Sequence, residues 1–257
     1  MFKNIYPLFE PKRILKREML ENLRDYPRNL FQIRYQACSD GILWGCGLTT
    51  EKGTIRIDPG VLLWKHTPYV LEDPCRIPYE ASGRTAYLSV HFTDRSSGNG
   101  QYEYRSQIRI SEEKPETGYE IELARFKLQP GARLRDTYTD FYDYCTEFDT
   151  LDRIHAPFAA PERYSIWPQA LKCFAKSLME YPVQNAWDPA FCMSCLQLTE
   201  AMPYRAVKAY LDVRLGQRKE YSNAEIYHAL MSILRQVSGT GYKAEGTERK
   251  ERKMLLV

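Results

Sequence analysis

The chain has 257 residues and a mass of 30.1 kDa, and 44% of its residues are hydrophobic and 27% charged. These proportions are typical of a folded protein with its own core, and the mean hydropathy of −0.52 leaves no room for a membrane span. The 36 Lys and Arg residues barely exceed the 33 Asp and Glu residues, giving a net charge of +3. We therefore expect neither a nucleic-acid surface nor membrane insertion.

Cysteine usage and the N-terminus indicate synthesis in a reducing cytoplasm. The seven cysteines are an odd number at no framework spacing, so we expect free thiols. They are Cys38, Cys46, Cys75, Cys145, Cys173, Cys192 and Cys195. The first residues lack the basic and apolar regions of a signal peptide, so lysis or an assembled particle would have to carry the protein out of a cell.

The N-terminal segment, residues 1–29, contains a short amphipathic helix predicted over residues 14–26. Leu15, Met19, Leu20 and Leu23 lie near one helical face, with charged residues elsewhere. Pro27 is expected to end this helix, because proline lacks a backbone N–H and clashes with the preceding turn. We expect the helix to pack on the body that follows.

Residues 30–128 read as a β-rich domain, because apolar residues recur there with a period of two. Leu88, Val90 and Phe92 begin this pattern, and a second alternating run covers residues 102–110. Residues 93–100 favour a hairpin turn between the two runs and lack the Lys-Ser or Lys-Thr pair of a phosphate loop. Further short strands are predicted over residues 42–48, 54–57, 61–64, 69–71, 75–79 and 119–128.

The second half of the chain changes to a helical pattern. Residues 129–166 form a connecting region, and residues 167–238 carry four short amphipathic helices, the first starting at Trp167. The end signals are Asp188 and Pro189 for the second helix, Gly216 for the third, and Ser222, Glu225 and Gly239 for the fourth. Residues 239–257 form a charged tail whose last four residues are apolar enough to dock on a neighbour.

These segments together predict an α+β fold. An N-terminal antiparallel β-sandwich or barrel-like domain is followed by a small C-terminal helical bundle.

The spacing Cys192-x-x-Cys195 is the only motif that points to metal or redox chemistry. It lies on a predicted helix, whereas a redox dithiol needs a strand-to-helix turn and a structural zinc site needs a second ligand pair. Cys173 and His228 are the only additions that the bundle offers. We interpret these cysteines as small core residues and expect no metal and no cofactor.

The histidines give no catalytic signature. They are His66, His91, His155 and His228, and each lies in a different predicted element. We therefore predict that the chain is not an enzyme. Because catalytic groups can converge from distant sequence, an enzyme with an unrecognised site stays an alternative.

Acidic residues are dense in the connecting region. Asp136, Asp140, Asp143 and Asp149 lack the glycine and terminal glutamate of an EF-hand loop. A solvated or inter-subunit face is the interpretation that we favour.

Aromatic residues supply the candidates for a protein interface. Tyrosine is enriched where proteins touch proteins or sugars, and this chain has 19 tyrosines. Tyr138, Phe141, Tyr142, Tyr144 and Phe148 form either an interface or an ordinary buried helix face. In the bundle, Tyr204, Tyr210 and Tyr227 are expected at a docking surface, since four short helices cannot hide every apolar side chain.

Three short segments carry a resemblance to known families. Residues 39–47, 57–62 and 68–71 read SDGILWGCG, IDPGVL and PYVL. This arrangement resembles the N-terminal anchoring modules of phage tail-fibre and baseplate proteins, with Pro59 and Gly60 in the place of a tight turn between two short strands. The order of β domain and helices is also similar to the shoulder and neck of the trimeric type VI secretion baseplate adaptor. The resemblance implies a structural role and carries over no catalytic residue.

The leading hypothesis is a structural or adaptor component of a phage-like contractile tail or injection-system baseplate. It would oligomerise and dock other baseplate or tail proteins, and would be assembled into a virion or injection particle. A carbohydrate- or receptor-binding module that displays Trp44, Trp64 and Tyr69 is the first alternative, and an enzyme with an unrecognised site is the second.

Overall fold

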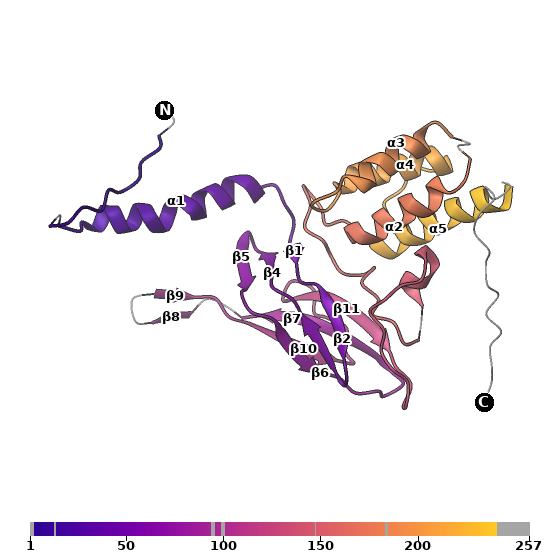
Figure 1. Cartoon of the computed structure of the whole chain (residues 1–257), viewed down its shortest axis with the longest axis horizontal. Coiled ribbons are helices and arrows are strands. Elements are labelled where there is room, and N and C mark those ends of the chain that lie inside the picture. The colour runs from indigo at the N-terminus through magenta and orange to yellow at the C-terminus, as the bar shows by residue number, and fades with distance from the viewer. Residues whose placement is uncertain are drawn as a thin grey trace.

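The computed structural model describes residues 3–12, 14–93, 96–98, 101–146, 148–182 and 185–240. In this part of the chain, a long N-terminal helix is followed by short antiparallel strands and then by four further α-helices (Figure 1). The fold is therefore α+β, as predicted. The described strands form three separate three-stranded sheets and one two-stranded ribbon, and they do not close into a barrel.

Each of the three sheets is antiparallel and consists of a middle strand paired with two edge strands. The first sheet has the order β1-β4-β5 and contains Gly41–Gly45, Gly60–Trp64 and Thr67–Leu71. The second has the order β2-β3-β6 and contains Leu48–Glu51, Thr54–Ile57 and Cys75–Pro78. The third has the order β10-β7-β11 and contains Ser106–Ser111, Thr85–Phe92 and Glu120–Lys127.

The alternating pattern predicted a half-buried strand, but β7 is buried on both faces, because Tyr87 and Ser89 are covered as well as Leu88 and Val90. Leu88, Val90 and Phe92 point into the core, and β7 pairs with β10 on one side and β11 on the other. Between β7 and β10 lies the ribbon of β8 (Ser96–Gly98) and β9 (Gln101–Glu103). Of the predicted hairpin turn, residues 94–95 and 99–100 lie outside the described residues.

One hydrophobic core joins the three sheets. Ile42, Ile55 and Leu88 come one from each sheet, are fully buried, and belong to a single cluster. The indole of Trp64 stacks on the ring of Phe92 with 4.8 Å between centroids. Burial of aliphatic and aromatic groups of this size stabilises by roughly 1.5–3 kcal/mol each, so this shared core holds the sheets together.

The Pro59-Gly60 step differs from the tight turn predicted between two paired strands. β3 and β4, on either side of it, belong to different sheets. Gly60 pairs with Gly45 at the end of β1, and a Cβ at Gly60 would lie 2.3 Å from the backbone nitrogen of Cys46. The step is therefore a corner between sheets, and glycine is needed because two backbones approach closely.

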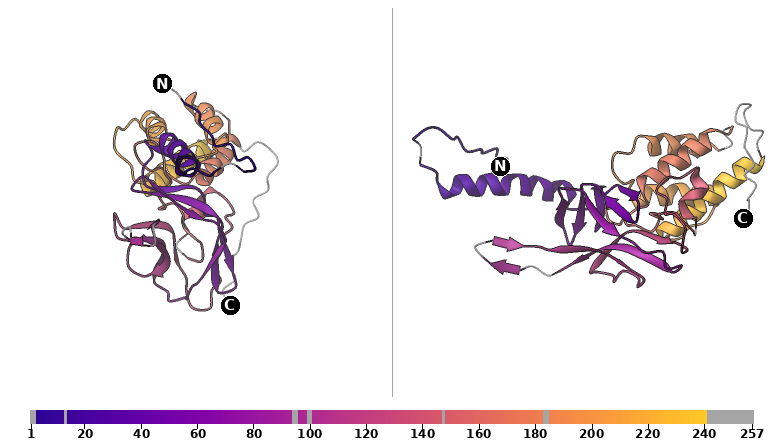
Figure 2. Two further views of the ribbon diagram at one scale, coloured as in Figure 1. Left: turned by 90° about the vertical axis from the view of Figure 1, so that its left-hand side faces the viewer. Right: turned by 60° about the horizontal axis from the view of Figure 1, so that its bottom comes forward.

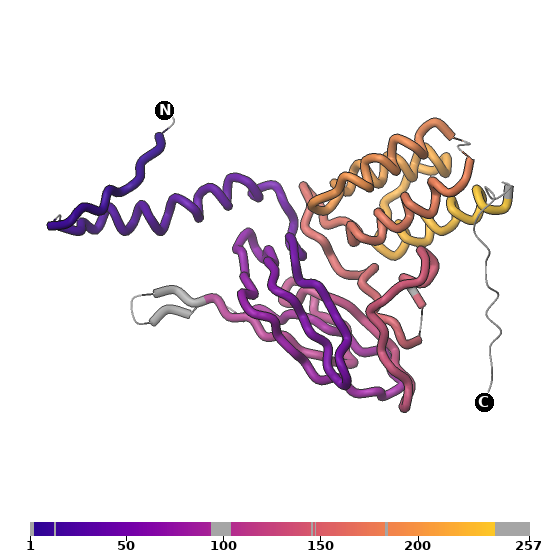
Figure 3. Tube along the Cα trace, viewed as in Figure 1, coloured from indigo at the N-terminus to yellow at the C-terminus, as the bar shows by residue number. Residues whose placement is uncertain are grey.

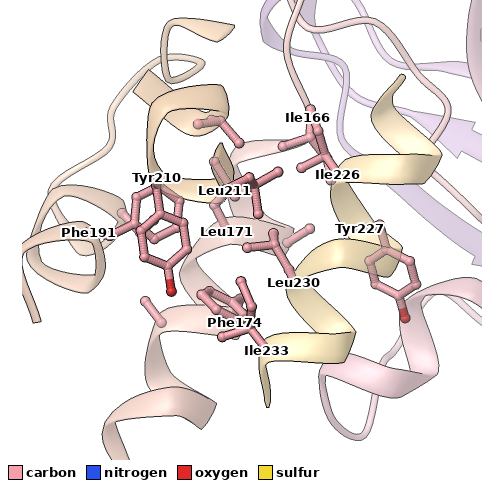
Figure 4. Packing of buried hydrophobic residues seen from close by; sticks show 14 of the residues in the cluster. Ile166, Leu171, Phe174, Phe191, Tyr210, Leu211, Ile226, Tyr227, Leu230 and Ile233 are labelled. Atoms are coloured by element: carbon pink, nitrogen blue, oxygen red, sulfur yellow. The ribbon is translucent and has the colours of Figure 1, made fainter. Parts of the chain in front are cut away.

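Helices α2 to α5 share a second hydrophobic core. Their bounds are Pro168–Met179, Trp187–Leu196, Tyr204–Leu215 and Asn223–Thr240. Leu171, Phe174, Leu211, Leu230 and Ile233 are buried in the centre of this helical region and face one another from different helices (Figure 4). Leu171 and Phe174 in α2, and Leu230 and Ile233 in α5, are three residues apart and so lie on one side of their helix, as the sequence pattern predicts.

Two of the four predicted end signals of these helices act as expected. Gly216 follows α4 in the left-handed conformation, with φ of 66°. The Ser222 amide donates to Glu225 Oε2 at 2.8 Å, and the Glu225 amide donates to Ser222 Oγ at 3.3 Å, which is a capping box. Asp188, predicted as an N-cap, instead lies inside α3, where it is buried and accepts from the Tyr210 hydroxyl at 2.9 Å.

The connecting region, residues 129–166, packs between the two cores. It contains a short 3-10 helix, Phe141–Cys145, and forms isolated bridges with β11 and β1. Arg153 is buried and donates from Nη2 to the carbonyl of Cys46 at 3.0 Å, and its guanidinium lies 4.8 Å from the Trp167 ring. Burial lowers the pKa of Arg153 to about 10. The Trp167 ring contacts both cores, so it links the sheets to the helical region.

The C-terminal end of α5 passes through Gly239, which was predicted to stop it, and reaches Thr240. Most of the predicted charged tail, residues 241–257, lies outside the described residues. Across the part of the chain that the structure describes, the helices are too short or too polar to cross a membrane.

Candidate docking surface

Helix α1, Arg17–Tyr35, projects from the body instead of packing along it (Figures 1 and 2). The structure describes all 19 of its residues, and none of them is buried. Figure 3 follows the chain from α1 directly into β1, so the helix is attached to the sheets at its C-terminal end. An amphipathic helix that its own chain leaves uncovered is suited to pack on another molecule.

The helix is longer than predicted because Pro27 does not end it. A proline inside a helix removes one backbone hydrogen bond and costs about 3 kcal/mol, but it does not prevent the following turns from forming. The last turn after Pro27 is held by contacts with the body. Glu18 in the first turn and Arg34 in the last also complement the helix dipole.

The last turns of α1 are anchored on the β1-β4 sheet. The rings of Phe31 and Tyr35 lie 6.0 Å and 5.5 Å from the ring of Trp44, and both pack on a small cluster of buried residues from β1 and β4. The Tyr35 hydroxyl donates to Glu200 Oε1 at 3.2 Å, which ties the helix end to the segment before α4. These contacts fix where the rest of α1 points.

Beyond this anchor, α1 exposes large apolar side chains. Leu23 is 56% exposed, Leu30 52% and Ile33 66%. Leu20 and Tyr26 are also exposed, and so are apolar residues of the segment before the helix. Singly exposed apolar residues are ordinary, but several on one helix form a continuous patch that marks an interaction site.

The spacing of apolar residues in the sequence indicates this surface, but the predicted end of the helix at Pro27 hid the pattern. Met19, Leu23, Tyr26, Leu30 and Ile33 follow one another at intervals of four, three, four and three residues. This is the spacing of the two seam positions of a coiled coil. Only a helix that runs through Pro27 brings all five residues onto one stripe.

A second apolar surface lies between α3 and α4. It is a groove of about 510 Å³, lined by residues that include Phe191, Met202 and Tyr210. Trp187 and Val213 at its edges are 58% and 53% exposed. Helices α3 and α4, which line this groove, belong to the helical region, whereas the free part of α1 projects away from it (Figure 1).

The aromatic residues predicted at the interface fill the interior instead. Phe141, Tyr204, Tyr210 and Tyr227 are buried, and Tyr138 and Tyr142 pack partly buried against the same core. The Tyr227 hydroxyl donates to the Phe141 carbonyl at 2.8 Å, and the Phe191 and Tyr210 rings stack 3.8 Å apart. These contacts within the chain use the side chains to hold the helical region together.

The three residues predicted as a recognition surface do not form one. Trp64 is buried against Phe92, and Tyr69 packs partly buried 4.7 Å from the same ring. Trp44 is 40% exposed but lies against Phe31 and Tyr35 of α1. The three side chains thus do not share one exposed platform of the kind that binds sugars.

The cysteine motif lies in the core of the helical region. Cys192 and Cys195 are buried in α3, and burial raises the pKa of Cys192 to about 11, so its thiol stays protonated at neutral pH. Of the two predicted additions, Cys173 is half-buried in α2 and His228 is exposed on α5. Among the described residues, no three His, Cys, Asp or Glu side chains gather closely enough to hold a metal ion.

The acidic residues of the connecting region are used internally. Arg135 pairs with both oxygens of Asp143 at 2.9 Å and 3.0 Å, and with Asp149 at 3.2 Å. The hydrogen bonds from Arg135 hold the pKa of Asp143 well below its usual range. Asp140 caps the 3-10 helix and Asp136 accepts from the Thr50 amide, so these groups shape the connecting region.

Comparison with known proteins gives similarity at the level of solved structures. No protein-family model matches the chain, and no curated protein does. A crystal structure of TssK is similar to it with 10% identity and a TM-score of 0.41, over 96% of this chain and 75% of that one.

Two assembled complexes also contain similar chains. A chain of the type VI secretion system TssK-TssF-TssG baseplate subcomplex has 9% identity and a TM-score of 0.43, over 93% of this chain and all of that one (100%). A chain of the baseplate complex from the type VI secretion system has 10% identity and a TM-score of 0.42, over 92% and 99% of the two chains.

Proposed function

We propose that the chain is a structural component of a phage-like contractile tail or injection-system baseplate, where it acts by docking other proteins. The observation that carries this proposal is α1, a helix of 19 residues with no buried side chain that is anchored at one end and projects from the body. Apart from Phe31 and Tyr35 in its anchored last turns, this helix adds no side chain to the cores of its own chain. Its exposed leucines and isoleucine supply the apolar area that a protein interface needs.

The proposal makes the chain a non-catalytic building block, made in the cytoplasm and incorporated into a particle. The antiparallel sheets and the four packed helices would be the rigid β-sandwich and helical bundle that hold α1 in position. Other baseplate or tail proteins are the partners, and no cofactor takes part. The resemblance of residues 39–47, 57–62 and 68–71 to baseplate anchoring modules favours this class of assembly.

Complementation in the producing cell tests the proposal. A strain that lacks the chain should fail to assemble particles, and the parent chain should restore them. The double variant Leu23→Glu with Leu30→Glu should not be incorporated, because two charges on an exposed apolar stripe cannot be buried in a contact. Sedimented particles would be probed for the chain by immunoblot and imaged by electron microscopy.

A charge-matched control is available on the other side of α1. Arg28→Gln with Gln32→Glu changes the net charge by the same two units and leaves the apolar stripe intact. This control should be incorporated like the parent. Normal particles from cells that lack the chain, or equal incorporation of both double variants, would contradict the proposal.

A further inference from the structure

We propose that the exposed stripe of α1 is a self-association seam, through which one copy of this chain packs against α1 of another copy in a short coiled coil. The seam consists of Met19, Leu23, Tyr26, Leu30 and Ile33. The inference deepens the proposed function, because it names a second copy as the first partner of the same helix.

The spacing of these five residues carries the inference. Intervals of four, three, four and three assign Leu23 and Leu30 to heptad position a, and Met19, Tyr26 and Ile33 to position d. In a coiled coil, a and d side chains of one helix insert between those of the other, and a seam built from one repeat is matched best by an identical repeat. The described helix covers the whole seam without interruption.

The seam faces away from the body of its own chain. Phe31 and Tyr35, whose rings pack on the body, fall at positions b and f of the same repeat, and Arg34 at position e pairs with Glu200 at 3.5 Å. Leu30 and Ile33, their neighbours on the seam, are 52% and 66% exposed. Anchoring and association therefore use different sides of the helix, and a second α1 can approach without displacing the body.

The residues that flank the seam permit a homotypic contact. Asn22 and Asn29 occupy the g positions and carry no charge, while Leu20 and Pro27 occupy e positions. Arg34 is the only charged residue at the e and g positions between Met19 and Arg34. Charges at e and g select partners in coiled coils, and like charges there oppose self-pairing. This helix has no such repulsion against a copy of itself.

Analytical ultracentrifugation of the purified full chain over a wide concentration series gives the first test. The parent should rise from 30.1 kDa to at least a dimer as concentration increases. The Leu23→Glu, Leu30→Glu variant should stay monomeric with unchanged circular dichroism, and the Arg28→Gln, Gln32→Glu control should associate like the parent. A parent that is monomeric throughout, or a seam variant that associates like the parent, would overturn the inference.

Cross-linking locates the contact within the seam. In a parallel pair, Tyr26, the central seam residue at position d, lies opposite Tyr26 of the other copy. Tyr26→Cys should form a disulfide-linked dimer under mild oxidation, well above the background of the native cysteines, whereas Gln32→Cys at position c should not. Equal cross-linking at both positions would contradict the seam.

The groove between α3 and α4 supplies a control that separates the possible surfaces. Val213→Glu places a charge in that groove and should leave association unchanged. If Val213→Glu abolishes association while the seam variant keeps it, the groove is the contact and the inference is wrong.

The two proposals fail in different ways. A monomeric parent whose seam variant is still lost from particles would reject self-association and keep the docking function. A parent that self-associates, with a seam variant that is incorporated normally, would keep self-association and reject the docking function of α1.

Discussion

Helix α1 and helix α5 contain the same kinds of residue in the same kind of pattern, yet one is uncovered and the other is buried. Leu30 in α1 is 52% exposed, whereas Leu230 in α5 is fully buried (0% exposed). Both lie on the apolar side of an amphipathic helix. The comparison teaches that periodicity defines which side of a helix is apolar, and that the remaining elements of the chain decide whether that side is covered.

The largest difference between the two regions should appear when a core side chain is truncated. Phe174→Ala in α2 removes a fully buried ring that contacts Phe141, Phe191 and Tyr210. We expect the free energy of unfolding to fall by about 3–5 kcal/mol, through lost burial and the cavity left behind. Urea unfolding followed by circular dichroism measures this loss, and a loss below about 1 kcal/mol would contradict the described core.

A pH effect should distinguish the packed joint between the two cores from the exposed helix. Burial, with the nearby Arg125 and His228, lowers the pKa of His155 from its ordinary 6.5 to about 4. The folded chain thus prefers the neutral imidazole. Its contribution to stability is complete above pH 6.5 and is lost as the pH falls toward 4, by roughly 2–3 kcal/mol.

Unfolding titrations of the parent and of His155→Gln over this pH window isolate the effect. The variant should lose less stability than the parent on acidification, because only the parent must protonate a partly buried imidazole whose pKa is lowered. Parallel pH profiles would show that His155 is not held in its neutral form.

A smaller effect is expected from the hydroxyl of a buried tyrosine. Tyr227→Phe keeps the ring and removes the hydrogen bond to the Phe141 carbonyl, which joins α5 to the connecting region. The carbonyl then stays buried without this donor, so we expect a loss of about 1–2 kcal/mol. Equilibrium unfolding of the two proteins side by side measures it. An exposed interface tyrosine would show almost no change.

The smallest effect should come from the exposed helix. Leu30→Ala in α1 should change the stability of the dilute chain by less than about 0.5 kcal/mol, since the side chain contributes little to the chain's own core. The matched substitution Leu230→Ala in α5 should cost about 2–5 kcal/mol. Similar losses at the two positions would mean that α1 is covered by its own chain.

Local patterns predicted much of the fold, and they failed where distant segments meet. The strand over Thr54–Ile57 and the capping box of Ser222 and Glu225 depend on neighbouring residues and agree with the sequence prediction. Pro27 was predicted to stop α1, but a single lost hydrogen bond does not outweigh the favourable turns and the anchor at Tyr35. Glycine is needed at position 60 because its backbone lies close to that of Cys46, and sequence spacing does not show this contact.

The candidate site was predicted less well for the same reason. Tyr210 and Tyr227 are of a residue type that is enriched at interfaces, but their hydroxyl groups donate to Asp188 and to the Phe141 carbonyl inside the chain. These acceptors lie 22 and 86 residues away in sequence. The seam of α1, in contrast, follows from the local spacing of its residues. It was missed only because the helix was expected to stop at Pro27.

Amide hydrogen exchange compares the uncovered helix and the buried helices most directly. The chain would be labelled at a dilution that keeps it monomeric and again in its associated form, or within particles. Amides of residues 19–33 should exchange rapidly in the monomer and become strongly protected on assembly, while the core amides of α5 should be protected in both states. Unchanged exchange over residues 19–33, with new protection between α3 and α4 instead, would contradict the claim that α1 is the docking surface.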